Sequence, residues 1–145
     1  MVSTHGAPKP ARRRVRRGAA AVEFALVAIP FFFFMFACIE FGRMNTVRQT
    51  VNNAAYEGAR KCIVPGATAA EGVAAAQAVL NAVGIRNTSV TVTPTTIVST
   101  TPNVTVRVTA PLAANLWVRP AFLGNTTVGS SCQLTVDWAV STRQQ

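Results

Sequence analysis

Glu23 is the residue near the start of this chain whose type and position could support a chemical function. It is the only acidic or basic side chain that is ordinarily charged at neutral pH in the apolar stretch from Ala19 to Ile39. A charged side chain inside a bilayer costs about 3 kcal/mol or more, so a glutamate there is a functional candidate. If the chain is cut after Gly18, the new amine of Ala19 in a neighbouring subunit could pair with Glu23 in one register only. The alternative is a glutamate whose carboxylate reaches the membrane surface, and the residues alone leave both interpretations open.

Three cysteines are the next candidates for chemistry. Cys62 and Cys132 follow the apolar stretch, on the side predicted to be extracytoplasmic, where disulfides form and persist. We expect these two to pair, with free thiols as the alternative. A bridge would close a long loop and stabilise the fold by roughly 3–5 kcal/mol in the chain-entropy model. Cys38 lies inside the apolar stretch and is expected to behave as a buried small hydrophobic residue.

Two pairs of opposite charges lie at helical spacing after the apolar stretch. Glu40 precedes Arg43 by three residues, and Glu57 precedes Lys61 by four. Side chains three or four residues apart are neighbours on a helix surface, so each pair could form an ion pair. Solvation of the four side chains at the surface is the alternative.

The sequence has no arrangement of residues that is typical of an enzyme or a metal site. The only histidine, His5, lies near the N-terminus, and no Cys/His spacing suggests a metal. No nucleophile–histidine pair or phosphate-binding loop is present, and the acidic residues after the apolar stretch are isolated from one another. We therefore expect no catalytic residue, metal, cofactor or small-molecule substrate.

The element that must position Glu23 is the apolar stretch itself. About 20 mostly apolar residues in helical form match the ~30 Å hydrocarbon thickness of a bilayer. The stretch is apolar on all sides, and a chain of 145 residues is too short to surround it with a soluble core. We expect residues 19–39 to form a transmembrane helix, which tolerates Pro30 because membrane helices re-satisfy the freed backbone group.

The positive charge of the chain is concentrated before this stretch. Six of the 14 basic residues precede it, within a chain of formal net charge +9. This positive-inside pattern places residues 1–18 in the cytoplasm and residues 40–145 on the other side of the membrane. A solvated tail that binds lipid or nucleic acid non-specifically is the alternative. No nucleic-acid recognition motif is present, so we expect no specific nucleic-acid partner.

Two helical patterns follow the apolar stretch. Residues 40–61 continue the first helix, now amphipathic, until Pro65-Gly66 ends it. Its expected apolar face comprises Phe41, Met44, Val47, Val51, Ala54, Ala55 and Ala59. A second helix is expected from Thr68, an N-cap with Glu71 three residues later, to Val83, and it should pack on the amphipathic part of the first.

The sequence then changes to a period of two, which predicts strands with threonine-rich outer faces. The three expected strands include Val90 with Val92, Val104 to Val108, and Leu134 to Val140. The connection from Ala110 to Gly129 contains several apolar residues, and it could cap the core or form a contact patch. The chain is therefore expected to be α+β, with a small antiparallel sheet of three or four strands.

Four segments follow from these patterns. Residues 1–18 form a basic cytoplasmic leader, and residues 19–39 form the transmembrane helix. Residues 40–64 form a periplasmic extension of that helix, and residues 65–145 form a small α+β extracytoplasmic domain.

Three blocks of sequence carry a resemblance to a known family. The stretch Arg17 to Leu26 resembles the processing site of type IV prepilins and pseudopilins: a basic leader, a glycine, an apolar helix and a glutamate at the fifth mature position. Together with Ile39 to Arg43 and Asn53 to Arg60, it resembles the TadE-like pseudopilins of the Tad (Flp) pilus apparatus. The resemblance covers Arg17 to Lys61, under a third of the chain.

This resemblance implies a minor pilin of a tight-adherence pilus in a bacterial inner membrane. It implies cleavage between Gly18 and Ala19 by an aspartic prepilin peptidase, and subunit assembly through Glu23 and Phe24. It further implies contacts with other pilins and Tad assembly proteins, and roles in pilus biogenesis, surface adhesion and biofilm formation. The alternative function is an uncleaved single-pass anchor that holds an outer domain beside a secretion or pilus machine.

Overall fold

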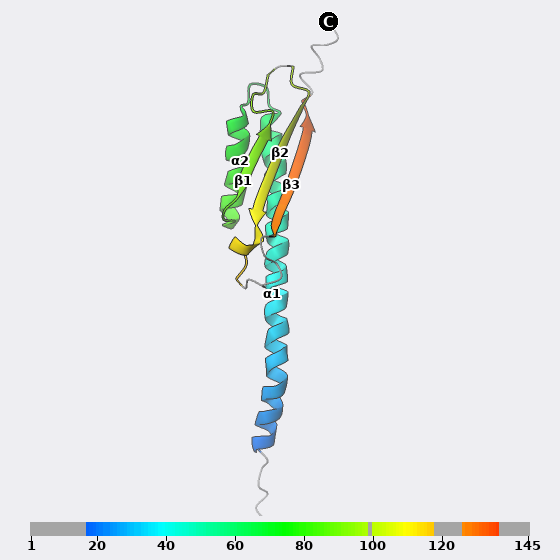
Figure 1. The fold of residues 1–145 in the computed structure, drawn as a ribbon, viewed down its shortest axis with the longest axis vertical. Helices are drawn as coiled ribbons and strands as arrows, with labels where there is room; N and C mark the ends of the chain where they lie inside the picture. The colour runs from blue at the N-terminus through cyan, green and yellow to red at the C-terminus, as the bar shows by residue number, and fades with distance from the viewer. Residues whose placement is uncertain (1–16, 99, 118–125, 137–145) are drawn as a thin grey trace, which may run out of the picture. The chain divides into compact units, whose positions relative to one another are not determined.

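The computed structural model describes residues 17–98, 100–117 and 126–136. It is an α+β protein, as expected, with two helices followed by a three-stranded antiparallel sheet (Figure 1). The elements are α1 (Arg17–Cys62), α2 (Ala69–Val83), β1 (Ser89–Thr93), β2 (Asn103–Pro111), the 3₁₀ helix η1 (Leu112–Ala114) and β3 (Thr127–Thr135). The chain divides into two compact units, unit 1 (Met1–Phe36) and unit 2 (Ala37–Gln145).

The described part of unit 1 is the first part of α1. The helix continues through Pro30, and nearly all of its side chains are exposed. Phe24, for example, has 74% of its surface exposed. Among the described residues, α1 is the one helix long and apolar enough to cross a membrane, and none of its most apolar window is buried. This helix is compatible with a single-pass membrane protein.

Within unit 2, α1 becomes amphipathic as its pattern predicts. The side chains of Val47, Val51, Ala54, Ala55 and Ala59 are buried, and Met44 packs against them. Phe41, predicted to belong to this face, is instead 68% exposed. Buried packing on α1 thus begins one turn later than the apolar pattern suggests. The helix ends at Cys62 before a turn in which Gly66 has a φ of 82°, a conformation that favours glycine.

Helix α2 has the ends that its sequence predicts. The Thr68 hydroxyl accepts a hydrogen bond from the Glu71 N–H at 3.3 Å, which satisfies one of the free N–H groups of the first turn. Gly84 ends the helix in the left-handed conformation, with a φ of 76°, and its N–H donates to the carbonyls of Leu80 and Asn81.

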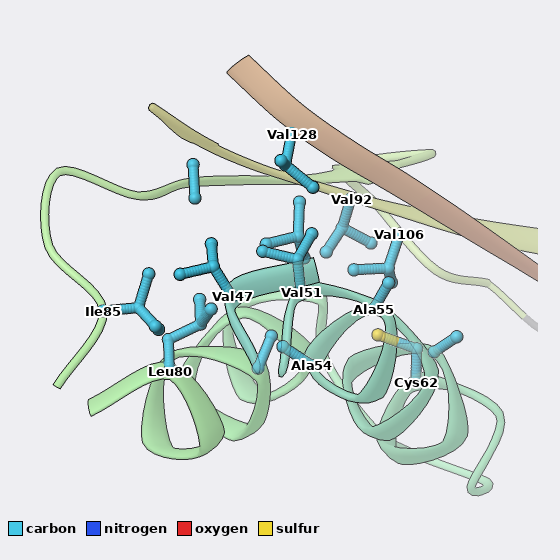
Figure 2. Close-up of a cluster of buried hydrophobic side chains, with 14 of the residues drawn as sticks. Val47, Val51, Ala54, Ala55, Cys62, Leu80, Ile85, Val92, Val106 and Val128 are labelled. Atoms are coloured by element: carbon cyan, nitrogen blue, oxygen red, sulfur yellow. The ribbon is translucent and has the colours of Figure 1, made fainter. Parts of the chain in front are cut away.

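The sheet has the order β1-β2-β3, with β2 in the centre. Val92 is paired with Val106, and Val106 with Cys132, so these three side chains share one face. That face covers the core (Figure 2). Within the core, Val104, Val106 and Val108 are fully buried. The other face carries Thr, Ser and Gln side chains around Arg107, so the sheet is apolar on one side and polar on the other.

The position of the third strand is the main correction to the predicted fold. The alternation of Leu134, Val136, Trp138 and Val140 predicted a strand there, but β3 begins at Thr127 and ends at Thr135. Its inward positions include Ser130 and Cys132, which are only half-buried at the edge of the sheet. Because Ser130 is polar at an inward position, the alternation of apolar and polar residues that predicts a strand is interrupted in β3. Trp138 and Val140 lie outside the described residues.

Candidate functional site

The predicted cleavage and assembly residues lie together in the first two turns of α1. Gly18, Ala19, Glu23 and Phe24 are all exposed, and a Cβ added at Gly18 would meet no atom within 4 Å. Ala19 and Glu23 are four residues apart on the helix, about 6 Å along its axis. Each of these residues is therefore free of packing within the described chain and accessible to another molecule.

A dense group of aromatic side chains follows on the same helix. Phe31 and Phe32 are in edge-to-face contact at 5.6 Å between ring centroids, and Phe33 and Phe34 at 6.1 Å. All four rings are exposed. An exposed apolar surface of this extent is not stable in water and marks a membrane or protein contact.

One of the two predicted charge pairs has a different partner in the structure. Glu57 pairs with Arg60 at 3.6 Å, three residues along α1, instead of with Lys61 four residues along. Both side chains of this pair are exposed, so it contributes at most about 1 kcal/mol to stability. Arg43, predicted to pair with Glu40, donates from Nε and Nη2 to the carbonyl oxygen of Asn115, at 3.4 and 3.1 Å. Its guanidinium also lies over the ring of Trp117, at 4.7 Å from the ring centre.

Asn115, whose backbone carbonyl accepts from Arg43, also has a buried polar side chain, which sequence analysis missed. It is 5% exposed, and its Nδ2 donates to the carbonyls of Pro111 and Arg86 at 2.8 and 3.1 Å. Its Oδ1 accepts from the Arg86 N–H at 2.8 Å. A buried amide bonded on both sides fixes the chain segments around it. The signal that could have revealed it is a lone amide within the apolar run from Leu112 to Trp117.

The apolar connection between β2 and β3 has both buried and exposed apolar residues. Leu112 is buried and Leu116 packs against the core, as expected of a cap. Trp117 is 70% exposed and held by Arg43. Phe122 and Leu123 lie outside the described residues. The part of the connection that the structure describes thus both caps the core and presents one exposed aromatic ring.

The predicted Cys62–Cys132 bridge is not formed in the structure, where both cysteines are free. Cys62 is buried with its sulfur against Gly72 of α2, whereas Cys132 lies on the edge strand β3 opposite Val106. Burial raises the pKa of the Cys62 thiol above its ordinary value of 9.0, and the carboxylate of Glu71 raises it further. Cys62 is therefore a poor nucleophile at neutral pH.

A hollow of about 420 Å³ lies between the α1–α2 turn and the β1–β2 loop. Its lining carries hydroxyl and methyl groups and no titratable side chain, and consists of Gly66, Ala67, Thr68, Ala69, Thr95, Thr96 and Ile97. Such a lining offers no acid, base or metal ligand.

Residues 18–60 match the family model described as TadE-like protein. This match confirms the resemblance found in the sequence, and it is consistent with a TadE-like protein of the Tad pilus system. No curated protein and no solved structure gives a significant match. The matched residues begin at Gly18 and end two residues before the end of α1, so the match covers this helix and leaves α2 and the sheet outside it.

Proposed function

We propose that this chain is a pseudopilin, a minor pilin of a Tad (Flp) pilus, cleaved after Gly18 by prepilin peptidase. The observation that carries the proposal is the TadE-like match over residues 18–60, on a helix whose N-terminal part is apolar and exposed. A helix of this kind can reside in a bilayer and later pack against the helices of other pilins.

The first residues of α1 have a defined role in this proposal. Cleavage leaves a positive amine on Ala19, and Glu23 of an adjacent subunit pairs with it when the two helices are in register. In a low dielectric the pair compensates two charges that would each be costly alone. A subunit out of register leaves both charges without a partner, so the pair selects one arrangement. The exposure of both residues supports this role.

The same proposal places the chain in the bacterial inner membrane with a single span. The basic residues 1–18 are cytoplasmic, and unit 2 lies in the periplasm or becomes part of an extracellular pilus. Its partners are prepilin peptidase, other pilins and pseudopilins, and Tad assembly proteins. Through the pilus, the chain acts in surface adhesion and biofilm formation.

The N-terminal mass of protein extracted from membranes tests cleavage directly. We expect the mature chain to begin at Ala19, and Gly18→Leu to retain its leader because the peptidase must accommodate a small residue before the cut. Gly42→Leu is the matched control, since Gly42 is also exposed on α1 with open space around it. A wild-type chain that begins at Met1, or a Gly18→Leu chain that is trimmed normally, would favour the uncleaved anchor.

The role of Glu23 is tested separately from cleavage. We expect Glu23→Ala to be processed normally but to lose most of its incorporation into sheared pili, because the Ala19 amine then has no carboxylate partner. Glu57→Gln, which removes an exposed carboxylate from the same helix, should assemble as wild type. Quantitative immunoblots of the pilus and membrane fractions give both readouts. Normal piliation by Glu23→Ala would refute the amine–carboxylate pairing.

A further inference from the structure

The end of unit 2 at which α2 ends and β3 begins presents aromatic and basic side chains together. Trp117 and Phe41 are the two most exposed large hydrophobic side chains that the structure describes in unit 2, at 70% and 68%. Arg43 lies over the Trp117 ring, and Arg86 is exposed in the loop between α2 and β1. We call Phe41, Arg43, Arg86 and Trp117 the basal cluster.

Three different segments supply the basal cluster. Phe41 and Arg43 come from α1, Arg86 from the α2–β1 loop, and Trp117 from the chain after η1. Figure 1 shows that the end of α2, η1 and the start of β3 lie at one end of the sheet. Asn115 holds them there, because its side chain bonds the Arg86 backbone and its carbonyl accepts from Arg43. The cluster is thus built by the fold.

The positions of Phe41 and Arg43 along α1 indicate which layer of a bilayer the basal cluster contacts. The apolar stretch ends at Ile39, and Arg43 follows four residues later, about 6 Å along a helix. The headgroup layer on each side of a bilayer is roughly 5–8 Å thick. Phe41 lies only about 3 Å along the axis from Arg43, on another side of the helix. A helix whose apolar stretch fills the hydrocarbon therefore carries Phe41 and Arg43 at headgroup depth, with Trp117 in contact with Arg43.

The chemistry of the cluster fits that layer. Tryptophan is enriched at membrane interfaces because its ring is apolar while its N–H is polar. Arg43 stacks on this ring, and its Nε and Nη2 donate to the Asn115 carbonyl. Within the described part of the chain Nη1 makes no such bond, so it can donate to a lipid phosphate. Arg86 adds a second positive charge, and its side chain is exposed.

We propose that the basal cluster docks unit 2 on the lipid headgroups, with Trp117 in the interface and Arg43 and Arg86 beside phosphates. This inference rests on the membrane span of the proposed function, but not on cleavage or pilus assembly. The docking fixes the height of unit 2 while the chain resides in the membrane. Extraction into a filament then requires breaking these headgroup contacts.

The depth of Trp117 in a bilayer tests this inference. In the full chain with Trp138→Phe, Trp117 is the only tryptophan. We would reconstitute one copy per nanodisc in phosphatidylcholine with phosphatidylglycerol, using lipids that carry a nitroxide at the headgroup or at acyl carbon 12. We expect headgroup quenching to exceed carbon-12 quenching about twofold or more, as for an interfacial ring. Absence of lipid quenching, with acrylamide access as high as in detergent, would overturn the docking. Quenching that requires several copies per disc would equally overturn it, in favour of a neighbouring subunit.

Charge variants show whether the basic residues hold the ring there. Arg86→Gln should lower headgroup quenching measurably without affecting folding, because Asn115 bonds only the backbone of Arg86. Arg43→Gln should lower it further. Arg60→Gln is the matched control, about 25 Å farther along α1. Equal quenching in all four proteins would contradict the role of the arginines.

Alkaline carbonate extraction of the same proteins in liposomes of the same lipids separates this inference from the membrane span. Protein that stays in the bilayer while Trp117 is unquenched overturns the docking alone. Protein that is released overturns the span and the docking together.

Discussion

Asn115 connects separate segments of unit 2 through one buried amide. The side chain bonds both backbone groups of Arg86, and it also bonds the carbonyl of Pro111 at the end of β2. The backbone carbonyl of the same residue receives Arg43 of α1. The partners of the Asn115 side chain are all backbone atoms, which any residue at positions 86 and 111 would supply. These hydrogen bonds therefore depend on the side chain of Asn115.

We predict that Asn115→Ala destabilises unit 2 by about 2–4 kcal/mol, because it removes three hydrogen bonds to partly buried backbone groups of Arg86 and Pro111. Asn115→Asp should cost at least as much, since it turns a donor facing two carbonyl oxygens into a carboxylate oxygen. Asn53→Ala, an exposed asparagine of α1, should change stability by under about 0.5 kcal/mol. Urea unfolding in detergent micelles measures the three values. Equal stability of the Asn115 and Asn53 variants would contradict the inferred role.

The sequence identifies some residues of the candidate site and not others, for a physical reason. Gly18 and Glu23 are easy to identify because each is unusual for its surroundings. Gly18 is a glycine at the start of a helix, and Glu23 is a charged residue within an apolar stretch. Trp117 is recognisable as apolar, but its contact with Arg43, which is 74 residues away, has no local signal in the sequence. Glu57 could pair with Arg60 or Lys61, both of which lie within reach on a helix, and spacing alone does not select between them.

At the scale of elements, the contact of α1 with α2 depends on small residues. A Cβ added at Gly58 would lie 3.0 Å from the backbone oxygen of Gly72, and one added at Gly72 would overlap the sulfur of Cys62. Ala54, Ala55 and Ala59 are completely buried on the same side of α1. The two helix backbones approach closely because neither carries a large side chain at the crossing.

We predict that Gly72→Ala destabilises unit 2 by about 1–3 kcal/mol, because its methyl group overlaps the Cys62 sulfur. In a Cys62→Ala background the sulfur is absent, so the same substitution should cost at least about 1 kcal/mol less. Gly42→Ala, with open space around it, should be neutral or slightly stabilising as a helix substitution. Thermal unfolding of the double-mutant cycle measures the coupling. Additive effects of Gly72→Ala and Cys62→Ala would show that the two residues do not share this space.

Helices were easier to predict from the sequence than strands. The ends of α2 follow from Thr68 and Gly84, whose local chemistry acts without the rest of the fold. The strand β3 was placed too late in the chain because its inward residues at an edge are half-buried and need not be apolar. The position of β3 along the chain is set by its pairing with β2, and such long-range pairing leaves no local pattern in the sequence.

At the scale of the whole molecule, the described parts of unit 1 and unit 2 differ in where their apolar side chains lie. The described part of unit 1 exposes apolar side chains almost throughout, whereas unit 2 buries its apolar residues between two helices and a sheet. The N-terminal sequence before the apolar stretch differs from both, because it is rich in basic residues and has no periodic apolar pattern. A chain with these properties is expected to be held by lipid hydrocarbon more strongly than by charge.

We predict that the protein stays in the membrane pellet in 1 M NaCl and at alkaline pH in carbonate. A protein held through phosphate contacts loses roughly 10³-fold or more in affinity between 50 and 200 mM salt, whereas burial of an apolar helix is not weakened by salt. Immunoblots of pellet and supernatant give the measurement. Release of most of the protein by salt would indicate that the basic residues, and not α1, hold it.

The core of unit 2 has a composition with a thermodynamic consequence. Its buried hydrophobic residues are mostly valine and alanine, the largest are Leu80, Ile85 and Leu112, and none of those that the structure describes is aromatic. Alanine loses no rotamer freedom when it is buried, and valine has little to lose because its branched side chain is already restricted. Ordering this core therefore costs little conformational entropy, but each side chain also removes little surface from water. Unit 2 should consequently have a small enthalpy of unfolding for its length and a broad thermal transition.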